Sequence, residues 1–163
     1  MCCKIQLMAH RFAANALVFL VIGCNPLGVE SAHAALGGDA ASVLADAQEL
    51  HGTTLSTLLI QYDIQEITND SGMRVREYLA RDGVVFAVTW SGPVVPNLKS
   101  LLGAHFDSYR QALAASKQPG VRRSLRTASP DLVVESSGHM RAYGGRAYLP
   151  RLIPAGTSLA DIR

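Results

Sequence analysis

The sequence has no cysteine beyond residue 24. Its three cysteines, Cys2, Cys3 and Cys24, all lie in the N-terminal segment. A chain from which that segment is removed can form no disulfide, and it can support neither thiol catalysis nor thiolate metal ligation. Such a domain must be stabilised by its apolar core, for which a hydrophobic content of 48% is ample.

Charge of one sign is not in excess either, since the formal net charge is +2 at pH 7. A nearly balanced chain has no global field that would attract nucleic acid or a membrane surface. One local basic cluster, formed by Arg122, Arg123 and Arg126, is too small for a phosphate track. We therefore expect no nucleic-acid partner, and membrane contact only through the N-terminal segment.

Hydrophobic runs long enough to span a bilayer are absent as well. Residues 12–22 form a largely apolar run behind a basic start, but a permanent span needs about 20 residues. Ala32 and Ala34 supply small side chains at the two positions that a signal peptidase pocket accommodates. The pattern predicts a signal peptide over residues 1–34, cleaved after Ala34, and hence a periplasmic or secreted protein.

A lipobox-like sequence offers an alternative to this cleavage. Val21, Ile22 and Gly23 precede Cys24, which would become a lipidated N-terminus. The protein would then be an envelope subunit anchored to a membrane through Cys24. Determining whether the mature chain starts at Ala35 distinguishes the two outcomes.

The remaining residues, 35–163, predict a single α+β domain. We expect an antiparallel sheet of about five strands, a three-stranded meander plus a C-terminal hairpin, packed against one long helix and a short N-terminal helix. The expected helices cover residues 39–51 and 97–115, and the expected strands cover residues 57–68, 73–81, 84–91, 132–143 and 146–149, with a further irregular strand at 121–127.

Two dipeptides predict the tight turns of this sheet. Asp82 and Gly83 fit a two-residue type I′ turn, which places Leu79 opposite Phe86 and sets the register of the second and third strands. The same pairing continues with Glu77 opposite Val88 and Val75 opposite Trp90, and Trp90 is expected in the core. Gly144 and Gly145 predict the turn of the C-terminal hairpin.

The Gly144-Gly145 turn defines the candidate binding site. It pairs Tyr143 with Arg146 and Arg141 with Tyr148, so that basic and aromatic side chains share one strand face with Glu135. The guanidinium groups could hold a carboxylate, phosphate or sulfate. Alternatively, these side chains satisfy one another on a solvated strand face. The candidate ligand-binding residues are His139, Arg141, Tyr143, Arg146 and Tyr148.

Catalytic motifs are scarce. The sequence contains no Gly-x-Ser-x-Gly elbow, no metal-ligand spacing and no nucleotide loop, so we expect no metal and no cofactor. Ser137 and His139 share a strand face but lie about 7 Å apart, too far for direct proton transfer. An envelope-polymer hydrolase with His139 as the base is nevertheless an alternative function. His105 lies on the apolar stripe of the long helix and is expected to be a buried core histidine.

Five segments of the chain, taken together, carry a resemblance to a known family. They are residues 35–38, 76–78, 82–88, 90–93 and 138–150. Together they resemble a family of small exported proteobacterial proteins known only as a domain of unknown function. The resemblance implies export and cleavage of the leader but no activity and no catalytic residue. From the basic and aromatic residues that share the hairpin face, we expect a non-enzymatic binding or interaction module whose partner is an envelope protein or a small anionic ligand.

Overall fold

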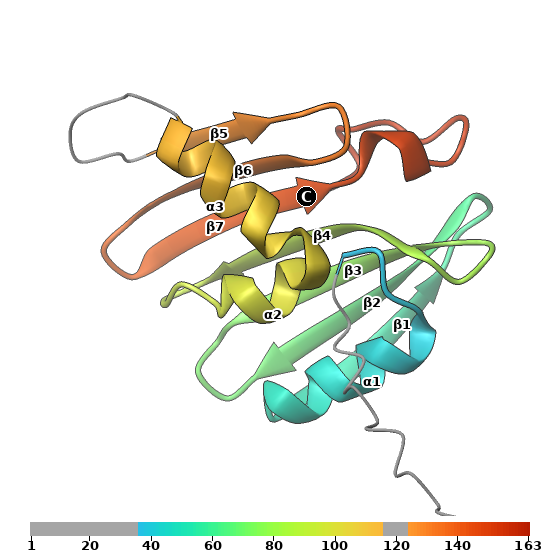
Figure 1. Cartoon of the computed structure of the whole chain (residues 1–163). Coiled ribbons are helices and arrows are strands. Elements are labelled where there is room, and N and C mark those ends of the chain that lie inside the picture. The colour runs from blue at the N-terminus through green and yellow to red at the C-terminus, as the bar shows by residue number, and fades with distance from the viewer. Residues whose placement is uncertain (1–35, 116–123) are drawn as a thin grey trace, which may run out of the picture.

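The computed structural model describes residues 36–115 and 124–163 (Figure 1). They form a mixed α/β domain with one seven-stranded antiparallel sheet. The predicted signal peptide, the lipobox at Cys24 and the basic pair Arg122 and Arg123 lie outside the described residues. Within the described ranges no helix is long and apolar enough to cross a membrane.

In the described residues, one α-helix is followed by four strands, then by two α-helices, and then by three strands. The helical elements are α1 (Ala40–Glu49), α2 (Leu98–Leu102) and α3 (Phe106–Ala115), with short 3₁₀ turns at Gly103–His105 and Pro150–Leu152. The strands are β1 (Gly52–Leu58), β2 (Tyr62–Asn69), β3 (Arg74–Ala80), β4 (Val85–Gly92), β5 (Ser124–Ala128), β6 (Val133–His139) and β7 (Ala142–Tyr148).

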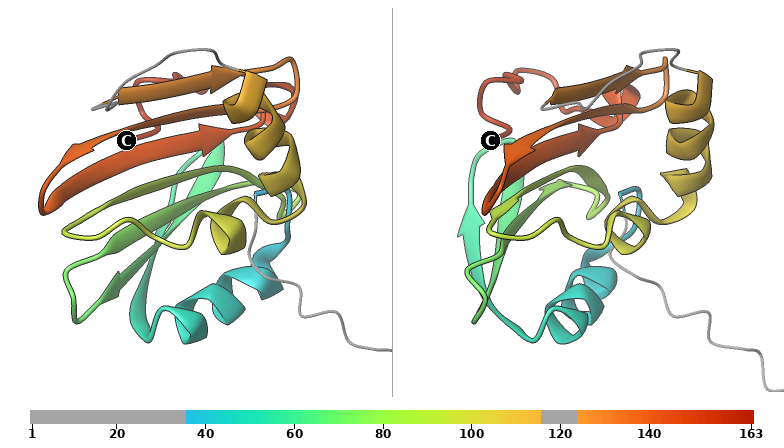
Figure 2. Two further views of the ribbon diagram at one scale, coloured as in Figure 1. Left: turned by 60° about the vertical axis from the view of Figure 1, so that its left-hand side comes forward. Right: turned by 90° about the vertical axis from the view of Figure 1, so that its left-hand side faces the viewer.

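The sheet has the strand order β1-β2-β3-β4-β7-β6-β5. All three helices lie on one side of the sheet, which we call the helix face (Figure 2). Residues 36–38 join this layer, because Leu36 donates its amide to the carbonyl of Leu101 and Gly37 donates to that of Val85. The main apolar core fills the space between the helix face and the helices, around Val75, Val88, Trp90, Leu102, Val134 and Ala147.

The opposite side, which we call the open face, is covered only in part. Residues 150–163, the C-terminal strap, cross it and bury Ile162 against an aromatic cluster. The rings of that cluster belong to Tyr62, Tyr78, Phe86 and Tyr148. The phenol oxygen of Tyr78 both donates to the carbonyl of Arg163 at 3.0 Å and accepts from its amide at 3.1 Å. The strap is therefore fixed by packing and by hydrogen bonds together.

The strand predicted over residues 57–68 is in fact interrupted by a turn at residues 59–61, which joins the end of β1 to β2. β1 ends at Leu58, and the amide of Leu59 donates to the carbonyl of Tyr62 to close the turn. Arg81 holds this turn, since its guanidinium donates to the carbonyls of Leu59 and Ile60 and pairs with Asp63 at 3.1 Å. No turn-forming residue marks the site, so local sequence alone did not reveal it.

The predicted register of β3 and β4 is confirmed away from their turn and is wrong beside it. Glu77 lies opposite Val88 and Val75 opposite Trp90, but Leu79 lies opposite Val85 instead of Phe86. Of the residues in this turn, only Gly83 takes a positive φ, 84°. The turn is closed by the amide of Ala80, which donates to the carbonyl of Val84. A three-residue loop of this kind shifts the register by one, and a β-bulge at Phe86 restores it. The bulge turns Phe86 toward the aromatic cluster on the open face.

The long helix predicted over residues 97–115 is interrupted. Asn97 caps α2 by accepting the amide of Lys99, as its side chain predicts, but the helix stops at Gly103, which takes φ 46°. α3 then starts at Phe106 and runs over β5 (Figure 1). His105 sits at this break and is half-buried beside Gly37 and Leu149, rather than fully buried in the core.

The predicted Gly144-Gly145 turn is wrong, because both glycines lie within β7. Ser137 pairs with Gly144 and Ser136 with Gly145, so the hairpin turns at Met140 and Arg141 instead. Gly145 has no side chain because Trp90 of β4 occupies that space: a Cβ there would overlap the indole ring and approach the carbonyl oxygen of Glu135 to 2.6 Å. The close approach of Trp90, rather than the need for a turn, explains why position 145 holds a glycine.

Candidate functional site

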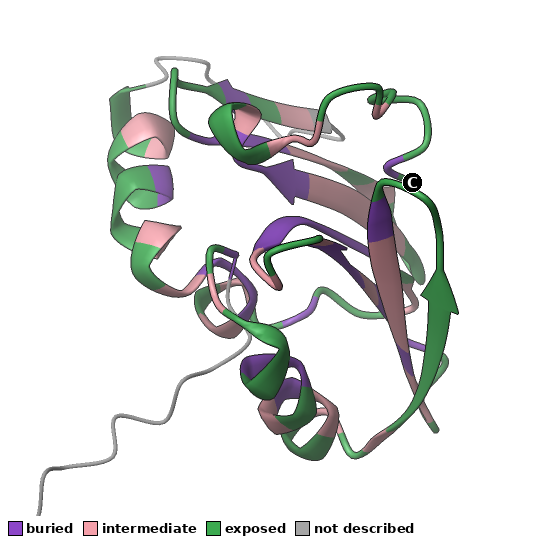
Figure 3. Cartoon of the chain, turned by 90° about the vertical axis from the view of Figure 1, so that its right-hand side faces the viewer, coloured by how far each residue is buried: buried purple, intermediate pink, exposed green. Residues whose placement is uncertain are grey.

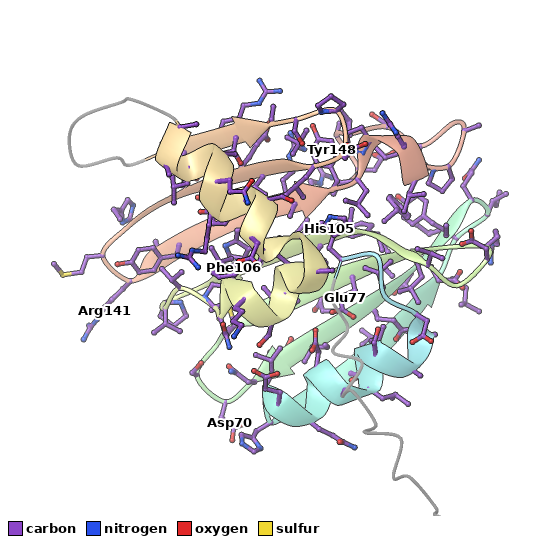
Figure 4. The ribbon with its side chains drawn as sticks, viewed as in Figure 1. Asp70, Glu77, His105, Phe106, Arg141 and Tyr148 are labelled. Carbon is purple, nitrogen blue, oxygen red and sulfur yellow. The ribbon has the colours of Figure 1, made fainter. Side chains whose placement is uncertain are left out.

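The β6–β7 hairpin ends in an exposed tip that extends beyond the end of β4. β4 ends at Gly92, which pairs with Tyr143, whereas the hairpin continues to the pair His139 and Ala142. Arg141 in the tip takes φ 64°, a left-handed conformation that costs a residue with a Cβ roughly 1–2 kcal/mol. Figure 4 shows the Arg141 side chain pointing away from the sheet.

An open hollow of about 680 Å³ lies between this tip and the end of β4. Its polar lining combines two hydroxyls, an imidazole, a guanidinium and a phenol. The residues that supply these groups are Ser91, Ser137, His139, Arg141 and Tyr143, and the rest of the wall is formed by Gly92, Pro93, Gly138, Ala142 and Gly144.

Two glycines of the hollow differ in what lies against them. A Cβ on Gly138 would lie 2.7 Å from Cδ1 of Tyr143, so the phenol ring lies across this glycine. Gly144 has no such neighbour; its nearest atom would be the carbonyl oxygen of Trp90 at 3.5 Å. The strand main chain is therefore accessible beside Ser137 and Gly144, with polar side chains around it.

Arg141 and His139 are the groups of the hollow that are available to a ligand. Among the described residues no carboxylate lies within ion-pairing distance of Arg141. The Nδ1 atom of His139 lies 3.4 Å from the carbonyl oxygen of Met140, a distance at which any hydrogen bond is weak. Both side chains are exposed. A free guanidinium beside hydroxyl donors is an arrangement suited to an oxyanion.

The structure separates the five predicted site residues into two groups. His139, Arg141 and Tyr143 line the hollow, although the ring of Tyr143 lies on the helix-face side of β7. Arg146 and Tyr148 lie further along β7 on the open face. The pairs Tyr143–Arg146 and Arg141–Tyr148 that motivated the grouping do not form, because the hairpin turns elsewhere.

Arg146 is engaged in contacts that hold the strap. Its Nε donates to Glu135 at 2.8 Å, and its Nη1 donates to the carbonyls of Leu159 at 2.8 Å and Ile162 at 3.3 Å. The guanidinium also lies 5.8 Å from the ring centroid of Tyr148, within the range of a cation–π contact. The predicted proximity of Arg, Tyr and Glu on one face is thus present here, with a structural role.

The catalytic alternative has part of its machinery in the hollow. Ser137 and His139 both line it, as two residues on the same strand face should. Among the described residues, however, no hydrogen bond joins them and no carboxylate orients the imidazole of His139. No group of three His, Cys, Asp or Glu side chains in the same part of the chain is placed to hold a metal ion.

A buried carboxyl pair on the helix face was missed in the sequence. Glu77 of β3 is fully buried and Asp46 of α1 is 2% exposed. Burial, together with the nearby carboxylate of Asp46, raises the pKa of Glu77 to about 9. The pair Glu77 and Asp46 is therefore expected to hold a proton at neutral pH. A weak signal existed, because Glu77 was the only polar residue among the apolar pairs predicted between β3 and β4.

Comparison with known proteins identifies one family. The profile described as "Protein of unknown function (DUF2844)" matches residues 32–162, which include the sheet, its helices, the hollow and nearly all of the strap. No curated protein and no solved structure matches the chain. The match confirms the resemblance to a domain of unknown function, while proteobacterial origin and export stay predictions.

Proposed function

Since the chain belongs to the DUF2844 family of proteins of unknown function, we propose a function from its own geometry. The protein is an exported, non-enzymatic module that binds a small anionic ligand, or an acidic group on an envelope partner. The binding surface is the hollow at the β6–β7 tip, with His139 and Arg141 as ligand-facing residues and Tyr143 packed behind them on the helix-face side of β7. Arg146 and Tyr148 support this hairpin from the open face.

The proposal depends on the backbone conformation and the exposure of Arg141. A glycine at this tip would relieve the backbone strain of φ 64°, yet the position holds a long cationic side chain. Other arginines of the sheet are paired: Arg76 with Glu66, Arg81 with Asp63, and Arg146 with Glu135. An exposed, strained and unpaired arginine beside a polar hollow is best explained by an anion that it binds.

Export supports the choice of partner. A leader over residues 1–34 would deliver the domain to the periplasm or beyond, where acidic sugars, phosphate and sulfate are accessible ligands. The cysteine-free body suits an oxidising compartment, because it has no thiol to mispair. Mass spectrometry of the mature N-terminus tests this part: a start at Ala35 supports signal peptidase cleavage, and a lipidated Cys24 would make the protein a membrane-anchored subunit instead.

An NMR titration of the purified protein tests the site itself. Phosphate, sulfate and glucuronate serve as probes, and backbone amide shifts report where each one binds. We expect saturable shift changes centred on residues 137–144, lost in Arg141→Ala and kept in Arg151→Ala. Arg151 is a matched control because it is also exposed but pairs with Asp131 at 3.1 Å. Shifts absent from the hairpin, or equally reduced in both variants, would contradict the proposal.

The hydrolase alternative rests on Ser137 and His139 sharing the hollow. It predicts that the protein cleaves an ester or an envelope polysaccharide and that either Ser137→Ala or His139→Ala abolishes cleavage. The binding module predicts no turnover in the wild type with either class of substrate. Release of product that disappears in both variants would establish the enzyme instead.

A further inference from the structure

The edge strand β1 lacks the features that usually protect a sheet edge. Natural edge strands carry charged side chains or proline, or are short or covered, because unpaired main-chain groups recruit other strands. β1 has the sequence Gly-Thr-Thr-Leu-Ser-Thr-Leu, without charge or proline, and Thr53 to Leu58 are all exposed. Figure 3 shows it as an exposed strand at the outer side of the sheet, with α1 set to one side.

The orientation of the β1 main chain can be deduced from its hairpin. The amide of Leu59 donates to Tyr62, so Leu59 and every second residue before it point their main-chain groups toward β2. The intervening residues, Thr54 and Ser56 among them, point their amides and carbonyls outward. Gly52 and Leu58 belong to the same outward set. These four residues make the edge that a further strand would pair with.

We propose that β1 pairs antiparallel with β1 of a second copy of this chain, about a two-fold axis at Leu55. Thr54 then lies opposite Ser56 of the second copy, and Gly52 opposite Leu58. Both pairs join residues whose main-chain groups point outward, so each can form the two hydrogen bonds of an antiparallel pair. The two sheets become one continuous sheet of two domains with closed symmetry.

The strand is self-complementary in its side chains about this axis. Thr53 meets Thr57, an ordinary cross-strand hydroxyl pair, and Leu55 meets Leu55 of the second copy. Leu58, which is 74% exposed, meets Gly52, where no side chain competes for the space. A charged residue near a two-fold axis would face its own copy, and β1 has none.

Apolar surface beside β1 adds to the contact. Leu55 is 65% exposed, and Leu59 and Ile60 in the turn after β1 are 39% and 87% exposed. The two-fold pairing brings each turn to the Gly52 end of the second copy. Such side chains stay in water in a single chain, and burying them is the main driving force for association. The symmetric sequence favours a second copy over an unrelated extended peptide.

Charged substitutions at Leu55 test the proposal in solution. Sedimentation equilibrium over a concentration series is expected to show a reversible dimer for the wild-type protein. Leu55→Lys and Leu55→Glu each place like charges face to face on the axis and should weaken dimerisation at least about tenfold, whereas an equimolar mixture should restore a heterodimer. The matched control is Met140→Lys at the β6–β7 tip, since Met140 is 85% exposed and the strands β2, β3 and β4 separate that hairpin from β1.

The following outcomes would contradict the proposal. A wild-type protein that is monomeric at every concentration would exclude the second copy as the occupant of this edge. A dimer that persists in Leu55→Lys, or that is lost equally in Met140→Lys, would place the interface elsewhere. Circular dichroism of the variants checks that they remain folded, which we expect because Leu55 is exposed in the single chain.

Discussion

The indole ring of Trp90 lies directly against the main chain of Gly145, so that a Cβ at Gly145 would overlap the ring. These residues belong to neighbouring strands, β4 and β7, and pair with each other in the register. The contact explains why a glycine is needed at position 145, inside a strand. The hairpin turns at Met140 and Arg141 instead, which places Arg141 at the tip beside the hollow.

Alanine at Gly145 is expected to destabilise the domain by about 1–3 kcal/mol, because the methyl group displaces Trp90 from a close-packed core. Gly144→Ala is the matched control. Its Cβ would lie 3.5 Å from the nearest atom and its φ is not positive, so stability should change little or rise by about 0.4–1 kcal/mol. Chemical denaturation measures both. Equal effects of the two substitutions would contradict the described packing.

The pair Glu77 and Asp46 should make stability fall as pH rises. Glu77 has a pKa near 4.5 when unfolded and about 9 when folded, so between these values only the folded chain keeps the proton. Unfolding then releases a proton, and the free energy of unfolding decreases with pH by up to about 1.4 kcal/mol per unit. The contribution is complete below pH 4.5 and is lost as pH approaches 9.

Denaturation curves between pH 5 and pH 9 check this dependence. Glu77→Gln keeps a hydrogen-bonding side chain without the titration and should flatten the slope. Glu66→Gln removes an ion-paired carboxylate on the open face and should leave the slope in place. A wild-type stability that is independent of pH over this range would show that Glu77 does not hold its proton.

Arg146 and Arg126, which both pair with Glu135, should differ in how much their loss destabilises the fold. Arg146→Ala removes an ion pair and two hydrogen bonds to strap carbonyls, and we expect a loss of about 1–3 kcal/mol. Arg126→Ala is the control because Arg126 pairs with the same Glu135 at 3.0 Å but is 66% exposed, so its loss should cost less than about 1 kcal/mol. Thermal unfolding compares the three proteins, and similar losses for Arg146→Ala and Arg126→Ala would refute the strap role.

The strap should detach when its buried anchor is removed. Ile162 is fully buried among Tyr62, Tyr78 and Phe86, so Ile162→Ala is expected to cost about 2–4 kcal/mol. Leu159→Ala, at a strap position that is 41% exposed, should cost far less. Hydrogen exchange locates the effect, which should appear first in residues 153–163. Unchanged exchange of the strap would mean that Ile162 does not anchor it.

Much of the fold could be predicted from alternation of apolar and polar residues. The β3–β4 register was recovered away from its turn because one slipped residue would have placed Val75 and Val88 on the wrong face. The α1 cap was also recoverable, since the Asp39 side chain accepts the amide of Ser42 at 3.0 Å. These features depend on neighbours within a few residues, which a single sequence displays.

The features that were missed depend on distant residues. A glycine pair looks the same whether it supplies a positive φ or makes room for a tryptophan, and Trp90 is 55 positions before Gly145. The turn after β1 is held by Arg81 of the β3–β4 turn, so no residue near it in the sequence predicts it. The predicted site therefore kept His139, Arg141 and Tyr143 around one hollow but not Arg146 and Tyr148.

Anion binding by Arg141→Gly tests the central claim most directly. Glycine relieves the strain of φ 64°, so the variant should be as stable as the wild type or more stable by about 1 kcal/mol, while it loses the guanidinium. We predict that the NMR titration with phosphate, sulfate and glucuronate then shows at least about tenfold weaker binding to the hairpin tip. A variant that gains stability yet binds these anions as tightly as the wild-type protein would contradict the account.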